Sequence, residues 1–330
     1  MEANLGLTVL LHRVGVSKIE SRGRWAEVVQ ARTEHGNIPL DHCYLICISN
    51  LAYLCIYISH YHYIWITEGK RQQLIAWLSP LPYNNKQSQT SDRRQTGTGD
   101  WLFEQQAYKS WEDGQVNALW IYGIPGSGKT FLTSKVIDRL LNDAGVHQYT
   151  LAYCYCDFTE NAAIMPVNII HTVLVQMLAM WDTNSPDQFP DLFSMLRLGQ
   201  GPPSSIPALV KLAERCLELA CHNRVFLVID ALDECTNRED LLQFICAIAL
   251  DKRVHILVTS RHEQDIIEQL SGSFSTISLS DHRSNLLTDM RQHLAEELKT
   301  PKWSHLHHRK NSVMKQELEE TLFKDSERNM

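Results

Sequence analysis

The sequence lacks an excess of positive charge, because 31 Lys and Arg residues stand against 38 Asp and Glu residues for a net charge of −7. Nucleic-acid-binding surfaces neutralise phosphates with clustered cations, so we expect no nucleic-acid partner. The nine Cys residues are odd in number and show no zinc-site spacing, which favours reduced thiols in an intracellular protein. Residues 1–37 are mixed and polar and lack a signal-peptide pattern. We therefore expect a cytoplasmic protein.

One stretch of 25 residues, Cys43–Thr67, contains no Asp, Glu, Lys or Arg. It is long enough to cross a bilayer, and Lys70 and Arg71 behind it would leave the rest of the chain in the cytosol. However, Asn50 and several His and Tyr residues dilute its apolar character. A membrane anchor, a buried segment and an error in the gene model all stay open, with membrane attachment the less favoured interpretation.

The remaining sequence divides by composition. Residues 1–70 give no assignable pattern outside the apolar stretch 43–67, and residues 71–99 predict a short helix followed by a polar linker over Pro82–Gly99. The main domain is predicted over residues 100–280, and residues 281–330 predict helices of a truncated C-terminal region.

Short apolar runs alternate with helical patterns throughout the main domain. This alternation predicts an α/β fold with three layers, in which helices cover both faces of a mainly parallel sheet. We predict strands at Ala118–Tyr122, Tyr149–Phe158, Val225–Ile229, Val254–Thr259 and Phe274–Leu279, helices at Thr130–Asn142, Val167–Met180, Ile206–Cys221, Arg238–Leu250 and Glu263–Leu270, and a loop over Trp181–Ser205.

A complete G-x-x-x-x-G-K-[ST] motif follows the first predicted strand and opens the first helix of the main domain. Glycines let the backbone curl around anionic oxygens, and the positive end of the next helix adds to the attraction. Lys129 is expected to reach the β- and γ-phosphates, and Thr130 to offer its hydroxyl to Mg²⁺. The motif therefore predicts a P-loop NTPase fold that binds ATP or GTP with Mg²⁺. The predicted nucleotide-binding residues are Gly123, Ile124, Pro125, Gly126, Ser127, Gly128, Lys129 and Thr130.

Acidic residues follow the apolar run Val225–Ile229. Asp230 ends this run, where a carboxylate at the tip of a parallel strand can hold Mg²⁺ through water. Asp233 and Glu234 are candidates to orient or deprotonate the attacking water, although acids also favour the start of a helix. We predict Thr130 and Asp230 as the metal site.

The predicted strand Val254–Thr259 ends in Ser260 and Arg261. A cation at this position can sense the γ-phosphate and couple its presence to domain position, although an exposed strand-end arginine is the alternative. We include Arg261 with Asp233 and Glu234 as the candidate catalytic residues. His262 and the other histidines show no metal spacing and are expected at the surface.

These motifs together resemble fungal NACHT proteins, most closely the variety with a nephrocystin-like N-terminal domain. In place of the Glu that many related ATPases carry after the magnesium Asp, this chain has Ala231, and the acidic pair comes later, as in that family. The resemblance rests on LWIYGIPGSGKTFLTSKVIDRL, LAYCYCDF, VFLVIDALDEC and VHILVTSRHE, with IAWLSP and TGDWLFEQQAYKSW ahead of them.

The resemblance implies a signal-transducing ATPase that is closed with ADP and oligomeric with ATP, with protein partners. The chain departs from the family after Leu279, where only Asn285–Leu298 and Lys315–Phe323 predict helices and no sensor repeats are found. A slow switch ATPase is the favoured function. The alternatives are a binding module that does not hydrolyse its nucleotide, or a truncated remnant of a larger receptor. A P-loop kinase is disfavoured because no Arg-rich lid is apparent.

Overall fold

The computed structural model divides the chain into two units, residues 1–66 and 67–330. The apolar segment 43–67, the predicted helix 315–323 and three histidines near the C-terminus lie outside the described residues. Within the described part, no helix is both long and apolar enough to cross a membrane. The described residues are 69, 71–78, 81–143, 149–159, 161–178, 190–219 and 224–300.

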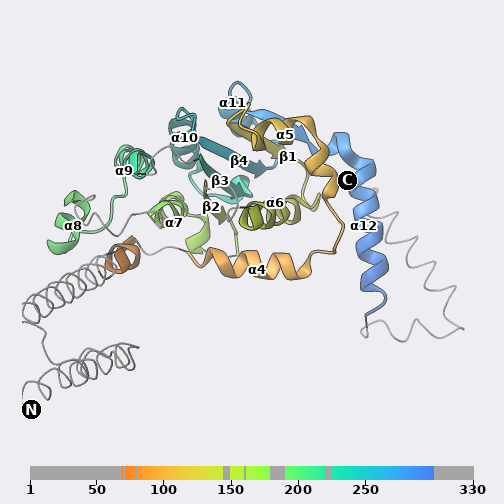
Figure 1. The fold of residues 1–330 in the computed structure, drawn as a ribbon, viewed down its shortest axis with the longest axis horizontal. Coiled ribbons are helices and arrows are strands. Elements are labelled where there is room, and N and C mark those ends of the chain that lie inside the picture. The colour runs from red at the N-terminus through yellow and green to blue at the C-terminus, as the bar shows by residue number, and fades with distance from the viewer. Residues whose placement is uncertain are drawn as a thin grey trace, which may run out of the picture. The chain divides into compact units, whose positions relative to one another are not determined.

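A parallel sheet of five strands forms the centre of the described part (Figure 1). The strand order is β2-β3-β4-β1-β5, so β4 lies between β1 and β3. The predicted strands are confirmed, with ends that differ by at most a few residues. The strands are β1 (Ala118–Tyr122), β2 (Tyr149–Tyr155), β3 (Arg224–Asp230), β4 (Val254–Ser260) and β5 (Ser275–Ser278).

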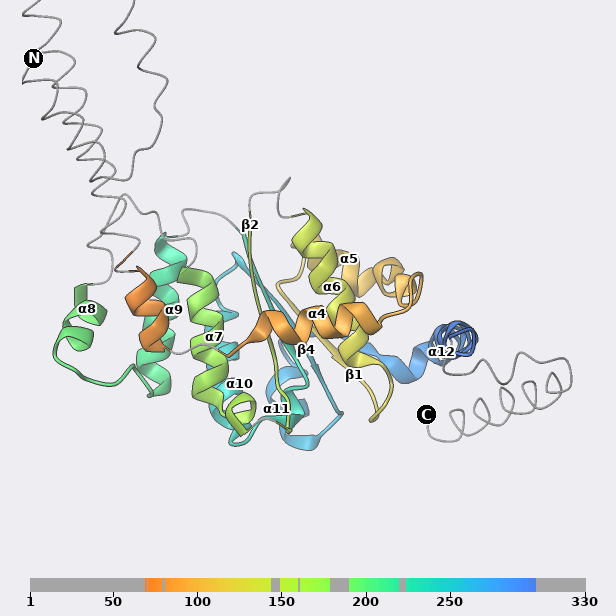
Figure 2. The same ribbon diagram turned by 90° about the horizontal axis from the view of Figure 1, so that it is seen from below.

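Helices lie on both faces of this sheet, which gives the predicted three-layer α/β/α architecture of a P-loop NTPase. Figure 2 shows α7 and α9 on one side of the strands and α5 and α6 on the other. Residues 71–78 form a further helical segment. The helices are α4 (Tyr83–Arg93), α5 (Gln106–Glu112), α6 (Lys129–Asp143), α7 (Pro166–Leu178), α8 (Pro190–Arg197), α9 (Ile206–Leu219), α10 (Arg238–Ile248), α11 (Gln264–Leu270) and α12 (Arg283–Glu297), with 3₁₀ turns at Asp100–Glu104, Asn161–Ile164, Leu232–Glu234 and Leu279–His282.

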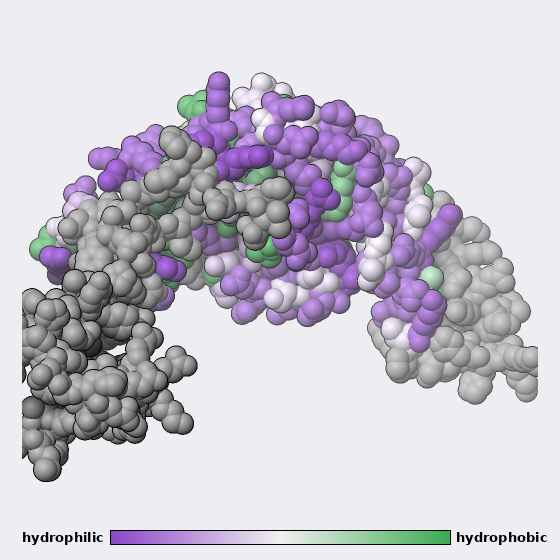
Figure 3. Space-filling model, in the orientation of Figure 1, coloured by the Kyte–Doolittle hydropathy of each residue, from purple (hydrophilic) through white to green (hydrophobic). Residues whose placement is uncertain are grey.

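The surface of the described part follows from this packing. In the view of Figure 3, hydrophilic residues cover most of the described surface, and hydrophobic residues form only small separate patches. Helices that turn an apolar stripe to the sheet and a polar face to solvent produce this distribution.

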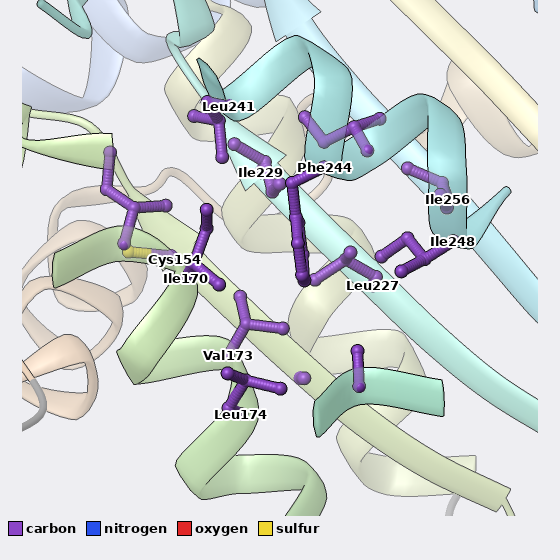
Figure 4. Close-up of a cluster of buried hydrophobic side chains, with 14 of the residues drawn as sticks. Cys154, Ile170, Val173, Leu174, Leu227, Ile229, Leu241, Phe244, Ile248 and Ile256 are labelled. Carbon is purple, nitrogen blue, oxygen red and sulfur yellow. The ribbon is translucent and has the colours of Figure 1, made fainter. Parts of the chain in front are cut away.

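Two buried clusters sandwich the sheet, because neighbouring residues of a strand point to opposite faces. In β3, Leu227 and Ile229 join the cluster under α7, α9 and α10, whereas Phe226 and Val228 join the cluster under α5 and α6. Figure 4 shows the first cluster, where Phe244 of α10 lies among aliphatic side chains of β3, β4 and α7. Burial of these side chains fixes the strand register, and with it the edge at which the strands end.

The polar segment Pro82–Gly99 does not form the predicted linker, because Tyr83–Arg93 fold as helix α4. This helix packs on α6 through polar contacts. Asp138 of α6 accepts hydrogen bonds from Gln87 Nε2 (2.6 Å), Ser91 Oγ (2.7 Å) and Arg94 Nη2 (2.6 Å). Helix prediction relies on an apolar stripe, and this helix is held by charge and hydrogen bonding instead.

The predicted loop Trp181–Ser205 also contains a helix, α8 (Pro190–Arg197). Pro190 occupies its first position, where the missing N–H costs nothing, and Leu192 and Phe193 are buried. Four prolines in the segment obscured this short helix. The domain limits proposed from the sequence stay a prediction.

Substitution Phe244→Ala tests the packing of the core. Phe244 is 0% exposed, and removal of a buried Phe costs about 3–5 kcal/mol, so we expect the urea midpoint of unfolding to fall clearly. The matched control is Phe158→Ala, because Phe158 is 67% exposed and should shift the midpoint little. Equal shifts in both variants would contradict the observed packing.

Substitution Asp138→Ala tests the polar attachment of α4. It removes the carboxylate that accepts hydrogen bonds from Gln87, Ser91 and Arg94, so we expect a loss of about 1–3 kcal/mol and faster hydrogen exchange within α4. The control is Asp92→Ala, an exposed acid on α4 itself. Unchanged exchange of α4 in the Asp138 variant would show that this contact does not hold the helix.

Candidate functional site

The glycine-rich motif forms a tight loop between β1 and α6. Gly126 and Gly128 have positive φ angles of 78° and 83°, which glycine adopts without steric cost. A Cβ on Gly123 would lie 2.8 Å from Ser127 Oγ and 2.9 Å from Leu279 Cβ, so only glycine allows this close approach. Open space surrounds Gly126 and Gly128 where a Cβ would stand. The backbone therefore forms a cradle for an anionic group at the start of α6.

Lys129 is the first residue of α6, and its ammonium group lies across this loop. Its Nζ donates to the carbonyl oxygens of Gly123 (2.7 Å) and Ile124 (2.9 Å). Burial lowers the pKa of Lys129, while the carboxylates of Asp233 and Asp230 oppose this shift. A half-buried cation on neutral carbonyls can exchange them for phosphate oxygens without leaving the loop.

Asp230 ends β3 and is only 1% exposed. Its carboxylate accepts hydrogen bonds from the hydroxyls of Thr130 (2.7 Å), Thr133 (2.7 Å) and Thr259 (2.6 Å). Burial raises the pKa of Asp230, and these three hydrogen bonds act against that shift. The carboxylate is thus held rigidly by α6 and β4.

The oxygen atoms of this cluster fit a hard divalent cation. The Thr130 hydroxyl and the Asp230 carboxylate lie 2.7 Å apart, and Mg²⁺ prefers such oxygen ligands. Ser127 Oγ in the loop is buried and has no hydrogen-bond partner within the described residues, which leaves it available to a bound group. The predicted metal residues Thr130 and Asp230 are therefore brought together, as the sequence indicated.

The chain turns sharply directly after Asp230. Ala231 has left-handed φ and ψ angles of 54° and 48°, which are uncommon outside glycine. Its backbone N–H donates to Thr259 Oγ1 at 2.9 Å, so the same hydroxyl that holds Asp230 also fixes the turn. The turn leads into the 3₁₀ segment Leu232–Glu234, which carries the acidic pair to the edge of the sheet.

Asp233 pairs with Arg261, the residue after β4. One carboxylate oxygen accepts from the Arg261 backbone N–H at 2.9 Å, and the other lies 2.9 Å from the Arg261 guanidinium Nε. The Asp233 side chain is 5% exposed, whereas the Arg261 side chain is 47% exposed. Two residues that the sequence placed at separate strand ends thus form one ion pair.

Glu234 has different surroundings. Its carboxylate accepts a hydrogen bond from the Phe158 backbone N–H at 3.0 Å, and no ion pair involving it is recorded in the described part. Burial raises the pKa of Glu234, and the nearby acids Asp233, Asp157 and Asp230 raise it further.

His262 is exposed, as the sequence predicted, and its ring also makes aromatic contacts. Although exposed, its ring stacks on Tyr122 with a centroid distance of 4.4 Å and on Trp120 at 5.6 Å. Trp120 Nε1 in turn donates to Ser260 Oγ at 2.8 Å. These contacts tie the end of β4 to β1 on both sides of Arg261.

A cavity of about 650 Å³ opens above the glycine loop. Beyond the predicted residues, its walls come from Phe131 and Leu132 of α6 and from three segments without a phosphate motif: the end of α4, the following loop and α12. Asp289 of α12 accepts hydrogen bonds from Gly99 N and Trp101 Nε1, both at 2.9 Å, which fastens the loop to the helix. Sequence motifs could not reveal this wall, because the loop after α4 and helix α12 come from opposite ends of the domain in the sequence. The cavity-lining residues outside the motifs include Arg93, Arg94, Gln95, Thr98, Gly99, Phe131, Leu132, Leu286, Asp289, Met290, His293 and Leu294.

Most predicted site residues line this cavity, whereas Gly123 and Asp230 are not among its lining residues. Ile124 instead lines a small cavity of about 90 Å³ behind the loop, together with Ser127 and Leu279. The lining residues among the predicted set are Pro125, Gly126, Ser127, Gly128, Lys129, Thr130, Asp233, Glu234 and Arg261.

Two solved structures are similar to part of this chain. One is Drosophila ORC bound to GC-rich DNA and Cdc6, with a TM-score of 0.36, 12% identity, and coverage of 60% of this chain and 60% of that chain. Another is the Aeropyrum pernix ORC1 protein in complex with DNA, with a TM-score of 0.35, 15% identity, and coverage of 67% and 53%. Neither similarity bears on what this chain binds.

Sequence comparison gives closer relationships. The vegetative incompatibility protein HET-E-1 of Podospora anserina is 29% identical over 187 residues, which are 54% of this chain and 13% of the relative. The chain therefore spans a small part of that protein. The model of the family described as Nephrocystin 3, N-terminal matches residues 97–261, from the loop after α4 to Arg261 at the site. This match covers half of the chain, and the chain belongs to the Nephrocystin 3, N-terminal family, with a P-loop NTPase-type domain related to that of HET-E-1.

Proposed function

We propose that this domain binds a nucleoside triphosphate with Mg²⁺ and acts as the nucleotide switch of a NACHT-type signalling protein. The observation that carries the proposal is the convergence of three groups on one cradle. These groups are the glycine loop, the ammonium of Lys129, and the paired oxygens of Thr130 and Asp230. Each group suits a different part of a metal–polyphosphate unit.

The phosphates are proposed to lie in the cradle at the N-terminus of α6. Backbone N–H groups of a curled loop and the positive end of a helix both favour anions. Lys129 would leave the carbonyls of Gly123 and Ile124 and contact phosphate oxygens, which form stronger hydrogen bonds with a cation than carbonyls do.

The metal is proposed to lie at the hydroxyl of Thr130 and near the carboxylate of Asp230. When bound, Mg²⁺ would neutralise part of the charge on the phosphates. The Asp230 carboxylate needs no rearrangement for this role, because Thr133 and Thr259 hold one of its oxygens while the other faces Thr130.

The base and ribose are proposed to occupy the rest of the cavity, against Phe131 and Leu132 of α6 and against α12. ATP is the favoured nucleotide, as in the family the sequence resembles, with GTP as the alternative. Acidic residues at the cavity support slow hydrolysis. Family membership and the relationship to HET-E-1 support a cytoplasmic signalling role with protein partners, including self-association in the ATP-bound state.

Substitution Lys129→Ala is expected to weaken ATP binding by at least about tenfold, because a charge-assisted contact to phosphate contributes about 1.5–3 kcal/mol. Isothermal titration with Mg²⁺-ATP measures the affinity, and thermal unfolding checks the fold. Lys211→Ala on the exposed side of α9 is the matched control and should bind as the unsubstituted protein does. Unchanged affinity in the Lys129 variant would refute the phosphate site.

Substitution Asp230→Asn separates metal binding from stability. Since burial raises the pKa of Asp230, its contribution to stability is present at acidic pH and is lost as the pH rises through the folded-state pKa. The Asn variant carries no buried charge at this position. Without nucleotide it should therefore melt at the same temperature as the unsubstituted protein or at a higher one near neutral pH, and this difference should vanish in acid. Mg²⁺ should no longer strengthen its ATP binding.

Two ATP titrations of each protein, one with Mg²⁺ and one with a chelator, measure how much Mg²⁺ strengthens ATP binding. Asp92→Asn on α4 is the control, because Asp92 is exposed. An Asp230 variant in which Mg²⁺ still strengthened ATP binding as in the unsubstituted protein would argue against this metal site.

A further inference from the structure

The buried residues of helix α4 are both polar. They are Gln87 and Thr90, so docking of the helix removes little apolar surface from water. Gln87 accepts a hydrogen bond from the Tyr155 hydroxyl and donates to Asp138 Oδ1 at 2.6 Å. It also donates to the Ser134 carbonyl at 3.1 Å. Water replaces such contacts at a smaller net loss than it replaces buried apolar contacts, so α4 can open locally while the core stays folded.

Fixed contacts lie on both sides of α4. Before the helix, the Leu81 N–H donates to Thr172 Oγ1 of α7 at 2.8 Å. After it, the Gly99 N–H donates to Asp289 of α12 at 2.9 Å. Residues 83–94, which we call the strap, can therefore lift from α6 while the chain on either side of them stays attached.

The far end of the strap reaches the cavity above the glycine loop. Arg93 and Arg94 line this cavity, whereas Asp138 does not. Asp138 Oδ2 accepts from Arg94 Nη2 at 2.6 Å, and Arg94 Nη1 donates to Ser134 Oγ at 3.0 Å. One carboxylate of α6 thus holds the strap down and also fixes the part of the cavity wall that the strap supplies.

The strap connects the cavity to the opposite face of the sheet. The helical segment 71–78 precedes it, and Leu74 of this segment is buried in the cluster under α7, α9 and α10. Tyr83 of the strap packs with the other cluster, and its ring lies 5.2 Å from that of Tyr153 in the edge strand β2. The chain therefore changes faces beside β2, ahead of the residues 97–261 that the family model matches.

We propose that docking of the strap is linked to occupancy of the cavity, with Asp138 as the positioning residue that sets the strength of this link. This inference rests on the proposed function. Bound nucleotide holds the strap on α6, because it contacts a wall that is complete only when the strap is docked. Release of the strap removes part of that wall and lowers the affinity for nucleotide. Displacement of the preceding segment 71–78 thus has a direct route to nucleotide release.

The link has a quantitative consequence, because coupling between two equilibria is reciprocal. The factor by which saturating nucleotide suppresses opening of the strap equals the factor by which complete opening weakens nucleotide binding. A variant in which the strap is open only part of the time loses affinity in proportion to the fraction that is docked. Its loss therefore never exceeds the first factor.

Hydrogen exchange of the full chain, followed by mass spectrometry, measures the first factor. We expect saturation with a non-hydrolysable ATP analogue and Mg²⁺ to slow exchange across residues 83–94 by at least about fivefold, the lower end of typical coupling. In Asp138→Ala without nucleotide, exchange across the same residues should be faster than in the unsubstituted chain.

Isothermal titration with the same analogue measures the second factor. For Asp138→Ala we expect the affinity to fall by about fivefold, within the limit set by exchange. Asp138→Asn should keep more of the affinity, because its amide oxygen still accepts from a donor of the strap. Asp92→Ala is the matched control, since Asp92 is an exposed acid of the same helix, and it should change neither exchange nor affinity.

A milder variant serves where Asp138→Ala does not fold, as judged by thermal unfolding. Ser91→Ala removes one donor to Asp138, a hydrogen bond of 2.7 Å, and leaves the carboxylate in place. We expect it to speed exchange of the strap and to weaken binding of the analogue, both by smaller factors than Asp138→Ala.

Failure of this inference is distinct from failure of the proposed function. An unsubstituted chain that binds no nucleotide refutes the proposed function. Nucleotide binding that leaves exchange of the strap unchanged refutes the link alone. The link is also overturned by a folded Asp138→Ala or Ser91→Ala variant whose strap exchanges faster at full affinity. An affinity loss greater than the exchange factor gives Asp138 a general structural role and overturns its proposed one.

Discussion

The buried carboxylate of Asp230 is the constraint on which the site depends. A carboxylate this deep in a protein is costly unless hydrogen bonds compensate for lost water, and three threonine hydroxyls supply them. Two of these threonines lie on α6, and Thr259 lies on β4. The same interaction therefore fixes the distance between the glycine loop, the acidic strand and the strand between them.

The position of β4 turns this constraint into a site. Because β4 lies between β1 and β3, the residue that follows it emerges between the glycine loop and the acidic turn. Thr259 holds Asp230 and also the N–H of Ala231, whose left-handed conformation directs the acidic pair toward the cavity. Strain at Ala231 is thus maintained by the hydrogen bonds that the buried carboxylate requires.

The cavity is completed by segments that flank the sheet. The loop before the first 3₁₀ turn is fastened to α12 by Asp289, which contacts Gly99 and Trp101. Leu279, just before α12, packs against Gly123 in the glycine loop. A change in the loop on nucleotide binding therefore has a direct physical route to α12, in keeping with the proposed role as a switch.

Local sequence determined the glycine loop, the apolar strands and the strand-end polar residues, because each depends on short-range chemistry and on a hydrophobic period. Tertiary structure alone decided the rest. Helix α4 was missed because polar contacts with Asp138 hold it, and α12 was not recognised as a cavity wall because its partners are remote in sequence. Asp233 and Glu234 are adjacent acids that sequence cannot tell apart, and they differ only in which group the fold brings to each: Arg261 to one, and the Phe158 backbone N–H to the other.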